Sequence, residues 1–254
     1  MRPASNAQIK LLRKLSQRKY REKEGLLIVE GERAVEQVLE NGVIEVQSVF
    51  VEEGLAVSFQ LTDNSFSLPK KTFTELADTE TPQGILAVCK IPEPVSMNKL
   101  QDLDSGVIVA TDAIQDPGNL GTIIRTASWF GSKAILLGKG TVDIFNQKVV
   151  RSTAGATGVL PYLSGGLNED LQKLEESGWN ILLLDGNSGA EPISELPKAK
   201  KTLLVVGNEA NGITPSLINP KRKRVLIPSN NGPKAVESLN AAVALSIALW
   251  SVHN

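Results

Sequence analysis

Beyond residue 105, short apolar segments alternate regularly with helical segments, and no other pattern in the chain limits the possible folds as strongly. The apolar segments lie at residues 107–110, 134–137, 181–184, 203–206 and 225–227. Strands that alternate with helices are typical of a parallel sheet, so we expect an α/β fold. Ligands bind at the carboxyl edge of an open parallel sheet. Polar residues and glycines follow these strands, so this edge is the expected functional site.

The first 93 residues predict a smaller α/β unit. Apolar residues recur at helical spacing between residues 7 and 18, and residues 26–31 and 84–89 resemble strands. Pro92 and Pro94 end this pattern, because two closely spaced prolines continue neither a helix nor a central strand. We therefore expect an N-terminal domain over residues 1–93, a linker over 94–104 and a C-terminal domain over 105–254.

Composition narrows the class of protein. Of the 254 residues, 41% are hydrophobic and 22% are charged, which is typical of a globular protein with a sizeable core. The apolar runs are too short to span a bilayer, and the N-terminus has no apolar core of a signal peptide. We expect a soluble cytoplasmic protein with no membrane partner.

The formal net charge of −1 conceals a basic N-terminal segment. Residues 1–25 carry eight of the 27 basic residues of the chain and only two of its 28 acidic residues. Local charge governs the field close to a surface, so this segment could bind a polyanion. The candidate contacts are Arg13, Lys14, Arg18, Lys19 and Arg21. A solvated helix face is an equally good interpretation, and a solvated loop would also explain the second cluster at residues 221–224.

The chain has one histidine and one cysteine. His253 is the penultimate residue, in a terminus that we expect to fray, so histidine-based triads and histidine-rich zinc sites are excluded. Cys89 alone forms neither an intramolecular disulfide nor a Cys-x-x-Cys motif, and a buried thiol is expected. We expect no metal site.

Residues 116–125, Asp-Pro-Gly-Asn-Leu-Gly-Thr-Ile-Ile-Arg, follow the first strand of the C-terminal domain and lead into a helix. Asn119 suits the capping position of that helix, which would explain it without any function. Arg125 lies among apolar residues of the helix, and an arginine on a buried side requires an anionic partner. A structural ion pair and a functional role both fit Arg125.

Two further motifs follow later strands. The first, residues 206–212, is a glycine-bounded turn that contains Gly207, Asn208 and Glu209, where the backbone can approach a ligand closely. The second begins at Ile227 and continues at residues 237–240. The helix after it, residues 241–250, is apolar all round and is expected to be buried, in the core or against another subunit. None of the glycine-rich stretches completes a dinucleotide or Walker motif, which argues against a small-molecule enzyme on an ordinary nucleotide-binding sheet.

In this order and spacing, the three motifs resemble those of the SpoU/TrmH branch of the SPOUT RNA methyltransferases. The resemblance covers residues 105–254, and residues 6–90 resemble the substrate-binding domain of the ribosomal-RNA members. It implies a SPOUT domain with a deep trefoil knot, a rare exception to unknotted chains. It also implies S-adenosyl-L-methionine as the methyl donor, a homodimer through the C-terminal domain, and methylation of a ribose 2′-hydroxyl in RNA, with large-subunit ribosomal RNA as the expected substrate.

The resemblance also implies roles for individual residues. The matching catalytic positions are Arg125, Asn119, Glu209, Ser238 and Asn240. The matching cofactor positions are Gly207, Asn208, Ile227, Leu239 and Ser238. Because an arginine stays protonated at neutral pH, we expect Arg125 to stabilise the developing alkoxide and not to act as a plain base. The basic residues of the N-terminal segment would bind the RNA.

Several alternatives stay open at this point. A transfer RNA could replace ribosomal RNA as the substrate, or the protein could bind RNA in ribosome assembly without catalysis. Within one subunit, Glu209 could pair with Arg125, Ser238 could cap the last helix, and Asn240 could bond the backbone. Residues 230–234 lengthen the link between Ile227 and Ser238 compared with many members of the family, which affects the expected loop. Ribosome maturation and antibiotic resistance are both compatible with the activity.

Overall fold

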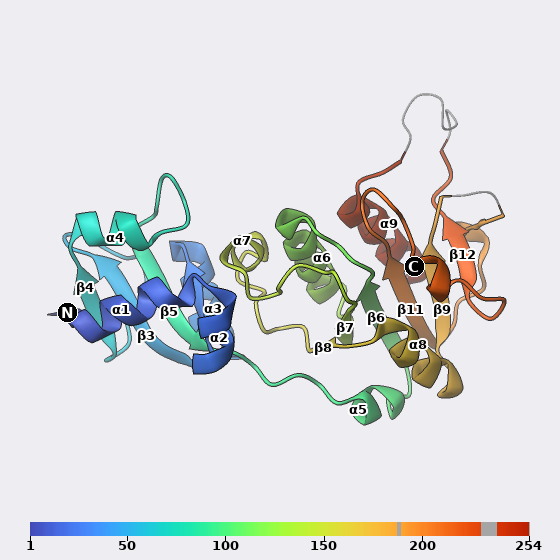
Figure 1. Cartoon of the computed structure of the whole chain (residues 1–254), viewed down its shortest axis with the longest axis horizontal. Helices are drawn as coiled ribbons and strands as arrows, with labels where there is room; N and C mark the ends of the chain where they lie inside the picture. Colours follow the sequence, from blue (N-terminus) through green and yellow to red (C-terminus); the bar gives the residue numbers. More distant parts are fainter. Residues whose placement is uncertain (187–188, 230–237, 254) are drawn as a thin grey trace. The chain divides into compact units, whose positions relative to one another are not determined.

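The computed structural model describes residues 1–186, 189–229 and 238–253, and the chain forms two compact units (Figure 1). Unit 1 comprises Met1–Glu93 and Asp143–Val159, and unit 2 comprises Pro94–Val142 and Leu160–Asn254. Within the described ranges, no helix is long and apolar enough to cross a membrane.

Unit 1 is built on a five-stranded mixed sheet with the order β1-β4-β3-β5-β2. The strands are β1 (Arg2–Pro3), β2 (Leu26–Glu30), β3 (Val46–Glu52), β4 (Ser65–Leu68) and β5 (Ile85–Lys90). The central strand β3 runs parallel to β4 and antiparallel to β5. The strands expected near residues 26–31 and 84–89 are confirmed as β2 and β5, which pair antiparallel. The sequence did not indicate β4.

Four helices from the N-terminal segment cover this sheet: α1 (Asn6–Leu15), α2 (Arg18–Glu24), α3 (Glu32–Asn41) and α4 (Lys70–Leu76). Ser5 and Gln8 cap α1 reciprocally, and Gly25 and Gly42 end α2 and α3 in the left-handed conformation that glycine adopts without strain. Leu12 and Leu15 of α1 pack with Phe50 and Phe73 in one apolar cluster. The helical periodicity of the N-terminus thus places its apolar face in the core of unit 1.

The structure differs from the expected domain division at residues 143–159, which pack within unit 1 although they lie between two strands of unit 2. This segment contains α7 (Gln147–Ser152). Gly155 and Gly158 have positive φ angles, and a side chain at either position would collide with Gln37 or Ile44. The two glycines therefore allow the backbone to approach α3 and the following residues closely, which is a tertiary contact that no local pattern shows.

Unit 2 contains a seven-stranded sheet with the order β10-β12-β9-β11-β6-β7-β8, and every neighbouring pair is parallel. The strands are β6 (Gly106–Thr111), β7 (Ala134–Leu137), β8 (Tyr162–Ser164), β9 (Asn180–Leu184), β10 (Glu191–Pro192), β11 (Lys201–Val206) and β12 (Lys223–Leu226). The parallel sheet expected from the apolar segments is confirmed.

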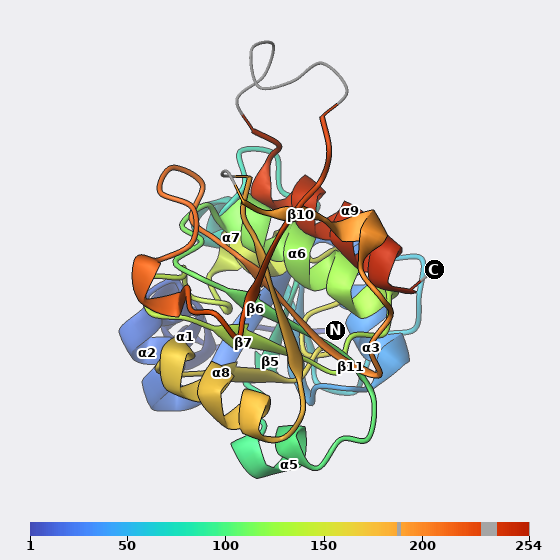
Figure 2. The ribbon, with the colours of Figure 1, turned by 90° about the vertical axis from the view of Figure 1, so that its right-hand side faces the viewer.

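Helices cover both faces of this sheet, with α6 (Pro117–Trp129) and α9 (Ala241–His253) on one face and α5 (Met97–Gln101) and α8 (Leu167–Glu176) on the other (Figure 2). Ile108 and Ala110 of β6 pack with α5 and α8. Two short 3₁₀ helices, Ile193–Glu195 and Pro215–Leu217, complete the unit. A sheet covered on both faces requires continuous apolar strands, which explains the pattern in the sequence. The expected linker, residues 94–104, instead contains α5, whose Leu100 is buried in this core.

The basic cluster at residues 221–224 is partly structural. Arg222 is 4% exposed, and its guanidinium donates to Glu175 at 2.6 Å and to Asn168 at 2.9 Å. Arg224 donates to Asp185 at 2.8 Å. These two arginines therefore tie the entrance of β12 to α8 and β9 and are not free to bind a ligand.

Candidate functional site

The site is formed by loops at the carboxyl ends of β6 and β11, which are neighbouring parallel strands. Thr111, at the end of β6, pairs with Val206, at the end of β11. Residues 112–116 and 207–214 therefore leave the sheet side by side. This is the edge at which open parallel sheets bind ligands, and it holds the first two sequence motifs.

Asp116, and not Asn119, caps α6. The Asp116 carboxylate accepts a hydrogen bond of 2.7 Å from the backbone N–H of Asn119, and Pro117 occupies the first helical turn, where its missing N–H costs nothing. The interpretation of Asn119 as the capping residue is wrong, because an acidic side chain three residues earlier fills that role. The side chain of Asn119 is therefore available for other contacts.

Asn119 joins the second and third sequence motifs. Its Nδ2 donates to Oε1 of Glu209 at 2.9 Å, and its Oδ1 accepts from Nδ2 of Asn240 at 2.8 Å. Asn240 lies directly before α9 and is 121 residues away along the chain. Residues from three separate motifs are thus hydrogen-bonded in one chain of contacts, which we call the amide bridge (Glu209, Asn119 and Asn240).

Glu209 is held as an ionised acceptor. Besides Asn119, the backbone N–H groups of Gln115 and Asp116 donate to its carboxylate, each at 3.3 Å. Burial alone would raise the pKa of Glu209, but the hydrogen bonds from Asn119 and from the backbone outweigh it, so the pKa lies below its ordinary value. Both carboxylate oxygens are engaged in these bonds. The alternative that Glu209 pairs with Arg125 within one subunit is therefore wrong.

The turn that carries Glu209 is shaped by its neighbours. Asn208 accepts from the backbone of residues 210 and 211 and donates to the carbonyl of Ala113 at 2.8 Å. Gly207 has no room for a Cβ, because the backbone of Gly212 lies against it. These contacts explain why Gly207 and Asn208 stand at these positions: they build the turn that presents Glu209 to Asn119.

The pair Asp112 and Thr214 closes the same turn at its far end. The buried carboxylate of Asp112 accepts from the backbone N–H of Thr214 at 2.6 Å and from its hydroxyl at 3.1 Å. Asp112 directly follows β6, but it is 102 residues away from Thr214 along the chain, so no local sequence pattern indicates the pairing. Thr214 is a site-supporting residue that sequence reasoning missed.

Asn240, and not Ser238, caps α9. Its Oδ1 accepts from the backbone N–H groups of Ala242 and Val243 at 2.9 and 3.3 Å. The capping alternative for Ser238 is therefore wrong, and the backbone bond expected of Asn240 is confirmed alongside its bond to Asn119. Ser238 and Leu239 are exposed next to this cap, and Ile227 is half-buried just beyond β12. The insertion noted at residues 230–234 lies outside the described residues.

Arg125 is exposed, which contradicts its expected place on a buried side of the helix. The buried residues of α6 include Gly121, Ile124 and Ala127, while Thr122, Arg125 and Trp129 face outward. Within the described part of the chain, no carboxylate lies within 4.0 Å of its guanidinium. The apolar composition of α6 was misleading because Trp129, at 85% exposure, belongs to the outer face too.

The basic N-terminal segment divides into exposed and buried residues. Arg13, Arg18 and Lys19 are exposed, and Lys14 is half-buried with its ammonium 5.4 Å from the centroid of the Tyr20 ring. Two of the four form surface ion pairs: Arg13 with Glu75 at 3.1 Å and Arg18 with Glu22 at 2.7 Å. Surface pairs of this kind contribute little to stability and are exchanged easily. These four side chains are accessible to a polyanion.

Arg21 differs from the other four because it is 3% exposed. It forms an ion pair of 2.5 Å with Asp143 and donates to the carbonyls of Leu15 and Ser16, each at 2.9 Å. The expectation that Arg21 contacts an external polyanion is contradicted by this burial. Its physical role is to hold the α1–α2 turn and residues 143–159 together in unit 1.

The single histidine is part of a packed cluster. His253 is the last residue of α9, and its ring stacks on Phe130 with centroids 5.6 Å apart. Burial lowers the pKa of His253. The helix continues to His253, whose exposed side chain keeps this aromatic contact at its end. The ring thus belongs to the packing of α9 against the end of α6.

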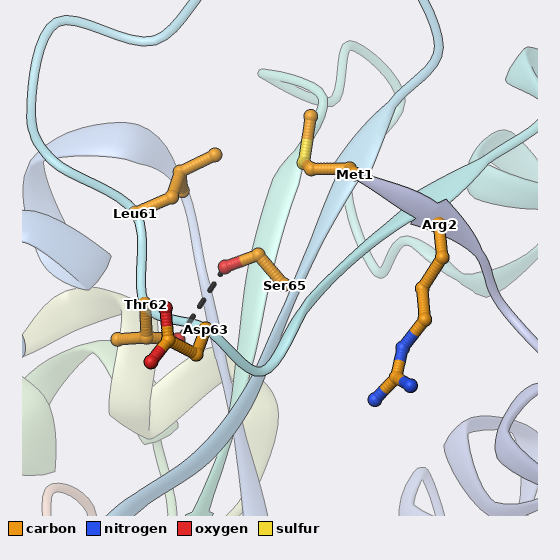
Figure 3. A pocket seen from close by; sticks show the side chains of 6 residues that line it. All are labelled: Met1, Arg2, Leu61, Thr62, Asp63 and Ser65. Atoms are coloured by element: carbon orange, nitrogen blue, oxygen red, sulfur yellow. Dashed lines mark hydrogen bonds between the residues drawn. The ribbon is translucent and has the colours of Figure 1, made fainter.

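A hollow in unit 1 is lined by Met1, Arg2, Leu61, Thr62, Asp63 and Ser65 (Figure 3). The Thr62 and Ser65 hydroxyls are 3.4 Å apart, and the Arg2 guanidinium lies 4.8 Å from the centroid of the Phe66 ring. These residues do not combine a nucleophile, a base and an oxyanion donor. The candidate site therefore stays at the carboxyl edge of the unit 2 sheet.

Comparison with protein families gives two matches that divide the chain. Residues 106–250 match the SpoU rRNA Methylase family, and residues 6–87 match the MRM3-like substrate binding domain. The first match spans more than half of the chain and contains Arg125 and all members of the amide bridge.

Two curated relatives illustrate the range of similarity. The chain is 34% identical over 251 residues to the 23S rRNA (guanosine(2553)-2′-O)-methyltransferase RlmP of Bacillus subtilis, covering 98% of this chain and 97% of that protein. It is 35% identical over 156 residues to the human mitochondrial rRNA methyltransferase 3, covering 58% of this chain and 37% of that protein.

Solved structures share the fold over nearly the whole chain. A putative RNA methyltransferase of the TrmH family from Porphyromonas gingivalis is 31% identical with a TM-score of 0.80, covering 98% of each chain. An AdoMet-bound rRNA methyltransferase from Sinorhizobium meliloti is 23% identical with a TM-score of 0.83, covering all of this chain and 96% of the other. At that identity the second likeness shows the fold alone.

Proposed function

Because this chain belongs to the SpoU rRNA methylase family, we propose that it methylates a ribose 2′-hydroxyl of large-subunit ribosomal RNA with S-adenosyl-L-methionine as the donor. The enzyme is an RNA 2′-O-ribose methyltransferase. Similarity to RlmP extends along both chains almost completely, which favours ribosomal RNA over transfer RNA as the substrate. The guanosine that RlmP modifies is the first position to test.

The observation that carries this proposal is the amide bridge with the free Arg125. Glu209, Asn119 and Asn240 lie in three motifs that are remote in sequence and are joined by bonds of 2.9 and 2.8 Å. Three of the catalytic positions that the family resemblance implies are thus present and meet at one edge of the sheet, which favours an active enzyme over a non-catalytic RNA-binding protein. Arg125, six residues after Asn119 on α6, is exposed and unpaired within the described chain, as a residue that awaits an anionic partner would be.

The reaction forms a bond between the ribose O2′ and the methyl carbon, breaks the bond between that carbon and sulfur, and releases the hydroxyl proton. Bound S-adenosylmethionine supplies the electrophilic methyl group. The Arg125 guanidinium stabilises the negative charge that develops on O2′ and binds the neighbouring phosphate. A phosphate oxygen or water accepts the proton, because the guanidinium is already protonated. Asn119 fixes the start of α6 and so orients Arg125, and positioning contributes much of the rate.

The residues at the sheet edge fit the cofactor. The turn at residues 207–212 offers backbone groups at a strand end, where Gly207 lets two backbone segments approach closely. Leu239, 47% exposed beside Asn240, and the half-buried Ile227 provide apolar surface for an adenine ring. Asn208 shapes the turn, and Ser238 lies next to Leu239. These residues hold the cofactor in our proposal, with Asn208 acting through the loop it orders.

The protein functions as a homodimer through unit 2 in our proposal. The exposed large apolar residues of α6, α9 and the segment before α9 are Trp129, Leu239, Val243, Ile247 and Trp250. Helices α6 and α9 are packed together, and exposed apolar surface of this kind supports a protein interface. Analytical ultracentrifugation tests it: the wild type sediments as a dimer, and Trp129→Glu together with Ile247→Glu shifts the protein toward a monomer. A monomeric wild type would contradict the dimer.

Family membership also supports a trefoil knot in unit 2, and similarity to the Bacillus subtilis protein RlmP along almost the whole chain favours action in the cytoplasm. Helix α9 contacts α6 and β11, the central strand of the sheet. An experimental structure that traces residues 227–241 tests the knot. A path of that segment outside the loops of unit 2 would refute it.

The activity is tested with purified protein, labelled S-adenosylmethionine and a 23S ribosomal RNA transcript. The label should enter one ribose and produce a single dinucleotide that resists alkaline hydrolysis, because a 2′-O-methyl group blocks cleavage. Transfer RNA serves as the competing substrate. Label on a base, or on transfer RNA alone, would reject the proposed substrate, and calorimetry with S-adenosylmethionine distinguishes an inactive preparation from a protein that does not bind the cofactor.

A further inference from the structure

The site edge of unit 2 is rich in carboxylates although the proposed substrate is a polyanion. Asp112, Asp116 and Glu209 all lie in the loops that follow β6 and β11. Phosphates of an RNA strand brought to this edge are repelled unless cations lie close by, because charges within a Debye length of about 8 Å interact at physiological salt. The loops therefore need a cation besides Arg125.

The loops that follow β6, β7, β8, β9 and β11 contain one lysine and no arginine, and the segment after β12 has Lys234, which lies outside the described residues. The loops that follow β6, β7, β8, β9 and β11 in unit 2 are residues 112–116, 138–142, 165–166, 185–190 and 207–214, and Lys139 is the single basic residue among them. It follows β7, which is the neighbour of β6 in the sheet. Lys139 therefore lies one strand away from the segment that leads to Asn119.

The loop that carries Lys139 is anchored to the strand end and loop of β6. The N–H of Gly138 donates to the carbonyl of Thr111 at 2.9 Å, and the N–H of Val142 donates to the carbonyl of Ile114 at 2.8 Å. The hydroxyl of Thr141 lies 3.2 Å from that of Thr111. These bonds hold residues 138–142 in a fixed position relative to the start of the first motif.

Two glycines flank Lys139 and make the close approach possible. A Cβ at Gly138 would lie 2.7 Å from the carbonyl oxygen of Thr111, which backbone packing does not permit. Gly140 has a φ angle of +90°, and a Cβ there would lie 3.1 Å from Ala113. The backbone around Lys139 is thus packed against the site loop, while its side chain is exposed.

Lys139 forms no ion pair within the described residues. No carboxylate in residues 1–186, 189–229 or 238–253 lies within 4.0 Å of its ammonium group. Exposed lysines elsewhere in the chain, such as Lys90 with Glu45 at 2.6 Å, do form such pairs. An exposed lysine on an anchored loop keeps its charge available for an external anion.

We propose that Lys139 binds a backbone phosphate of the substrate RNA close to the acceptor nucleotide. This inference rests on the proposed function, since it requires RNA at the carboxyl edge. Lys139 contacts the substrate as a point charge and takes no part in the methyl transfer. It adds affinity for RNA without reading the base, because phosphate contacts carry no sequence information.

The test compares Lys139→Ala with Lys133→Ala, since both lysines flank the same strand at opposite ends. Lys133 precedes β7 at the amino edge, where its side chain packs over Gly106. Removal of one bound phosphate reduces the slope of log K against log salt by about 0.7 to 0.9, which is about five- to eightfold in affinity at 0.1 M salt. Lys139→Ala should show this weakening, whereas Lys133→Ala and Lys139→Arg should bind as the wild type does.

Binding of a ribosomal RNA fragment is measured over a range of salt concentrations, together with calorimetric binding of S-adenosylmethionine. Affinity for the cofactor and the melting temperature should be unchanged in Lys139→Ala, because the side chain is exposed. An unchanged salt slope in this variant, or an equal weakening in Lys133→Ala, would overturn the proposal. If the wild type binds RNA with the expected Lys139 dependence and methylates none of it, the proposed activity fails and the phosphate contact stands.

Discussion

Arg21 of α2 and Arg125 of α6 each lie in the opposite environment to the one that their neighbours in the sequence indicate. Arg21 lies in a basic segment, yet it is 3% exposed and paired with Asp143. Arg125 lies in an apolar helix, yet it is exposed and has no carboxylate partner in the described chain. The partner of Arg21 is 122 residues away, so no local pattern reveals it.

The difference shows what separates a structural arginine from a functional one. A buried guanidinium requires partners within the fold, and Arg21 has two backbone carbonyls and one carboxylate, although its buried Nε has no partner in the described chain. An exposed guanidinium costs nothing to leave unpaired, and Arg125 can therefore bind a phosphate and a developing alkoxide. Removal of each should affect a different property of the protein.

The largest effect is expected for Arg125→Ala. Removal of a group that stabilises charge in the transition state lowers the rate by about a hundred- to thousandfold. Stability should change by less than about 0.5 kcal/mol, because the side chain that is removed is exposed and has no partner in the described chain. Single-turnover methylation and calorimetric binding of S-adenosylmethionine measure the catalytic step and cofactor binding separately. Full turnover in Arg125→Ala would remove the arginine from the mechanism.

Arg21→Ala should give the opposite result. It leaves the carboxylate of Asp143, which is mostly buried, without its partner, and breaking a buried ion pair in this way costs about 3–5 kcal/mol. Urea denaturation measures the change, with Arg18→Ala as the control, since the exposed pair of Arg18 with Glu22 contributes no more than about 0.5 kcal/mol. Equal stability in the two variants would show that burial of Arg21 does not matter.

Glu209→Gln tests whether the amide bridge needs a carboxylate. The NH₂ group of the glutamine cannot accept the hydrogen bonds that Asn119 and the backbone N–H groups of Gln115 and Asp116 donate to the carboxylate. The turn at residues 207–212 should therefore loosen, and the free energy of unfolding should fall by about 1 kcal/mol. Because the folded pKa of Glu209 is lowered, its contribution is present above the ordinary glutamate pKa and is lost as the pH falls through the folded value.

The pH dependence of unfolding therefore provides the control for Glu209. Stability of the wild type should decrease at acidic pH more steeply than that of Glu209→Gln, which has no carboxylate to protonate there. An equally steep loss of stability at acidic pH in the two proteins would show that Glu209 is not held as an ionised acceptor.

The smallest effect per residue is expected in the basic segment. Neutralising Arg13, Lys14, Arg18 and Lys19 together should weaken RNA binding and reduce its salt slope by about 0.7 to 0.9 for each phosphate that is no longer bound. Two of these residues are already paired with Glu75 and Glu22, so fewer than four phosphates are expected to be involved. If the neutralised variant binds RNA with the same dependence of log K on log salt as the wild type, this segment is only a solvated helix face.

Much of unit 2 was predictable because it follows from a local pattern. Continuous apolar strands indicate a sheet covered on both faces, and the structure has this sheet with β7 at the predicted residues. The motif positions Asn119, Glu209 and Asn240 were also recognisable, and the structure joins them. The sequence did not predict that Asn119 would bond to both Glu209 and Asn240. These contacts depend on the segments after β6, after β11 and before α9, which meet only in the folded chain.

Other features depend on contacts that sequence periodicity does not encode. Residues 143–159 pack in unit 1 through Gly155 and Gly158, whose close approach requires a specific neighbour. Arg222 is buried while the flanking Lys221 and Lys223 are exposed, although the four residues of this cluster look alike in the sequence. The capping residues were misassigned for a similar reason, since Asp116 and Asn240 compete with Asn119 and Ser238 within three residues.

In the proposed mechanism, unit 2 methylates one ribose of ribosomal RNA with Arg125 at the acceptor. Mapping of 2′-O-methyl groups in ribosomal RNA tests it directly, in cells without this protein and in the same cells supplied with wild-type or Arg125→Ala protein. We predict that one large-subunit nucleotide lacks its 2′-O-methyl group without the protein and regains it with the wild type only. An unchanged methylation map would refute the proposed activity, and full restoration by Arg125→Ala would refute the role of Arg125.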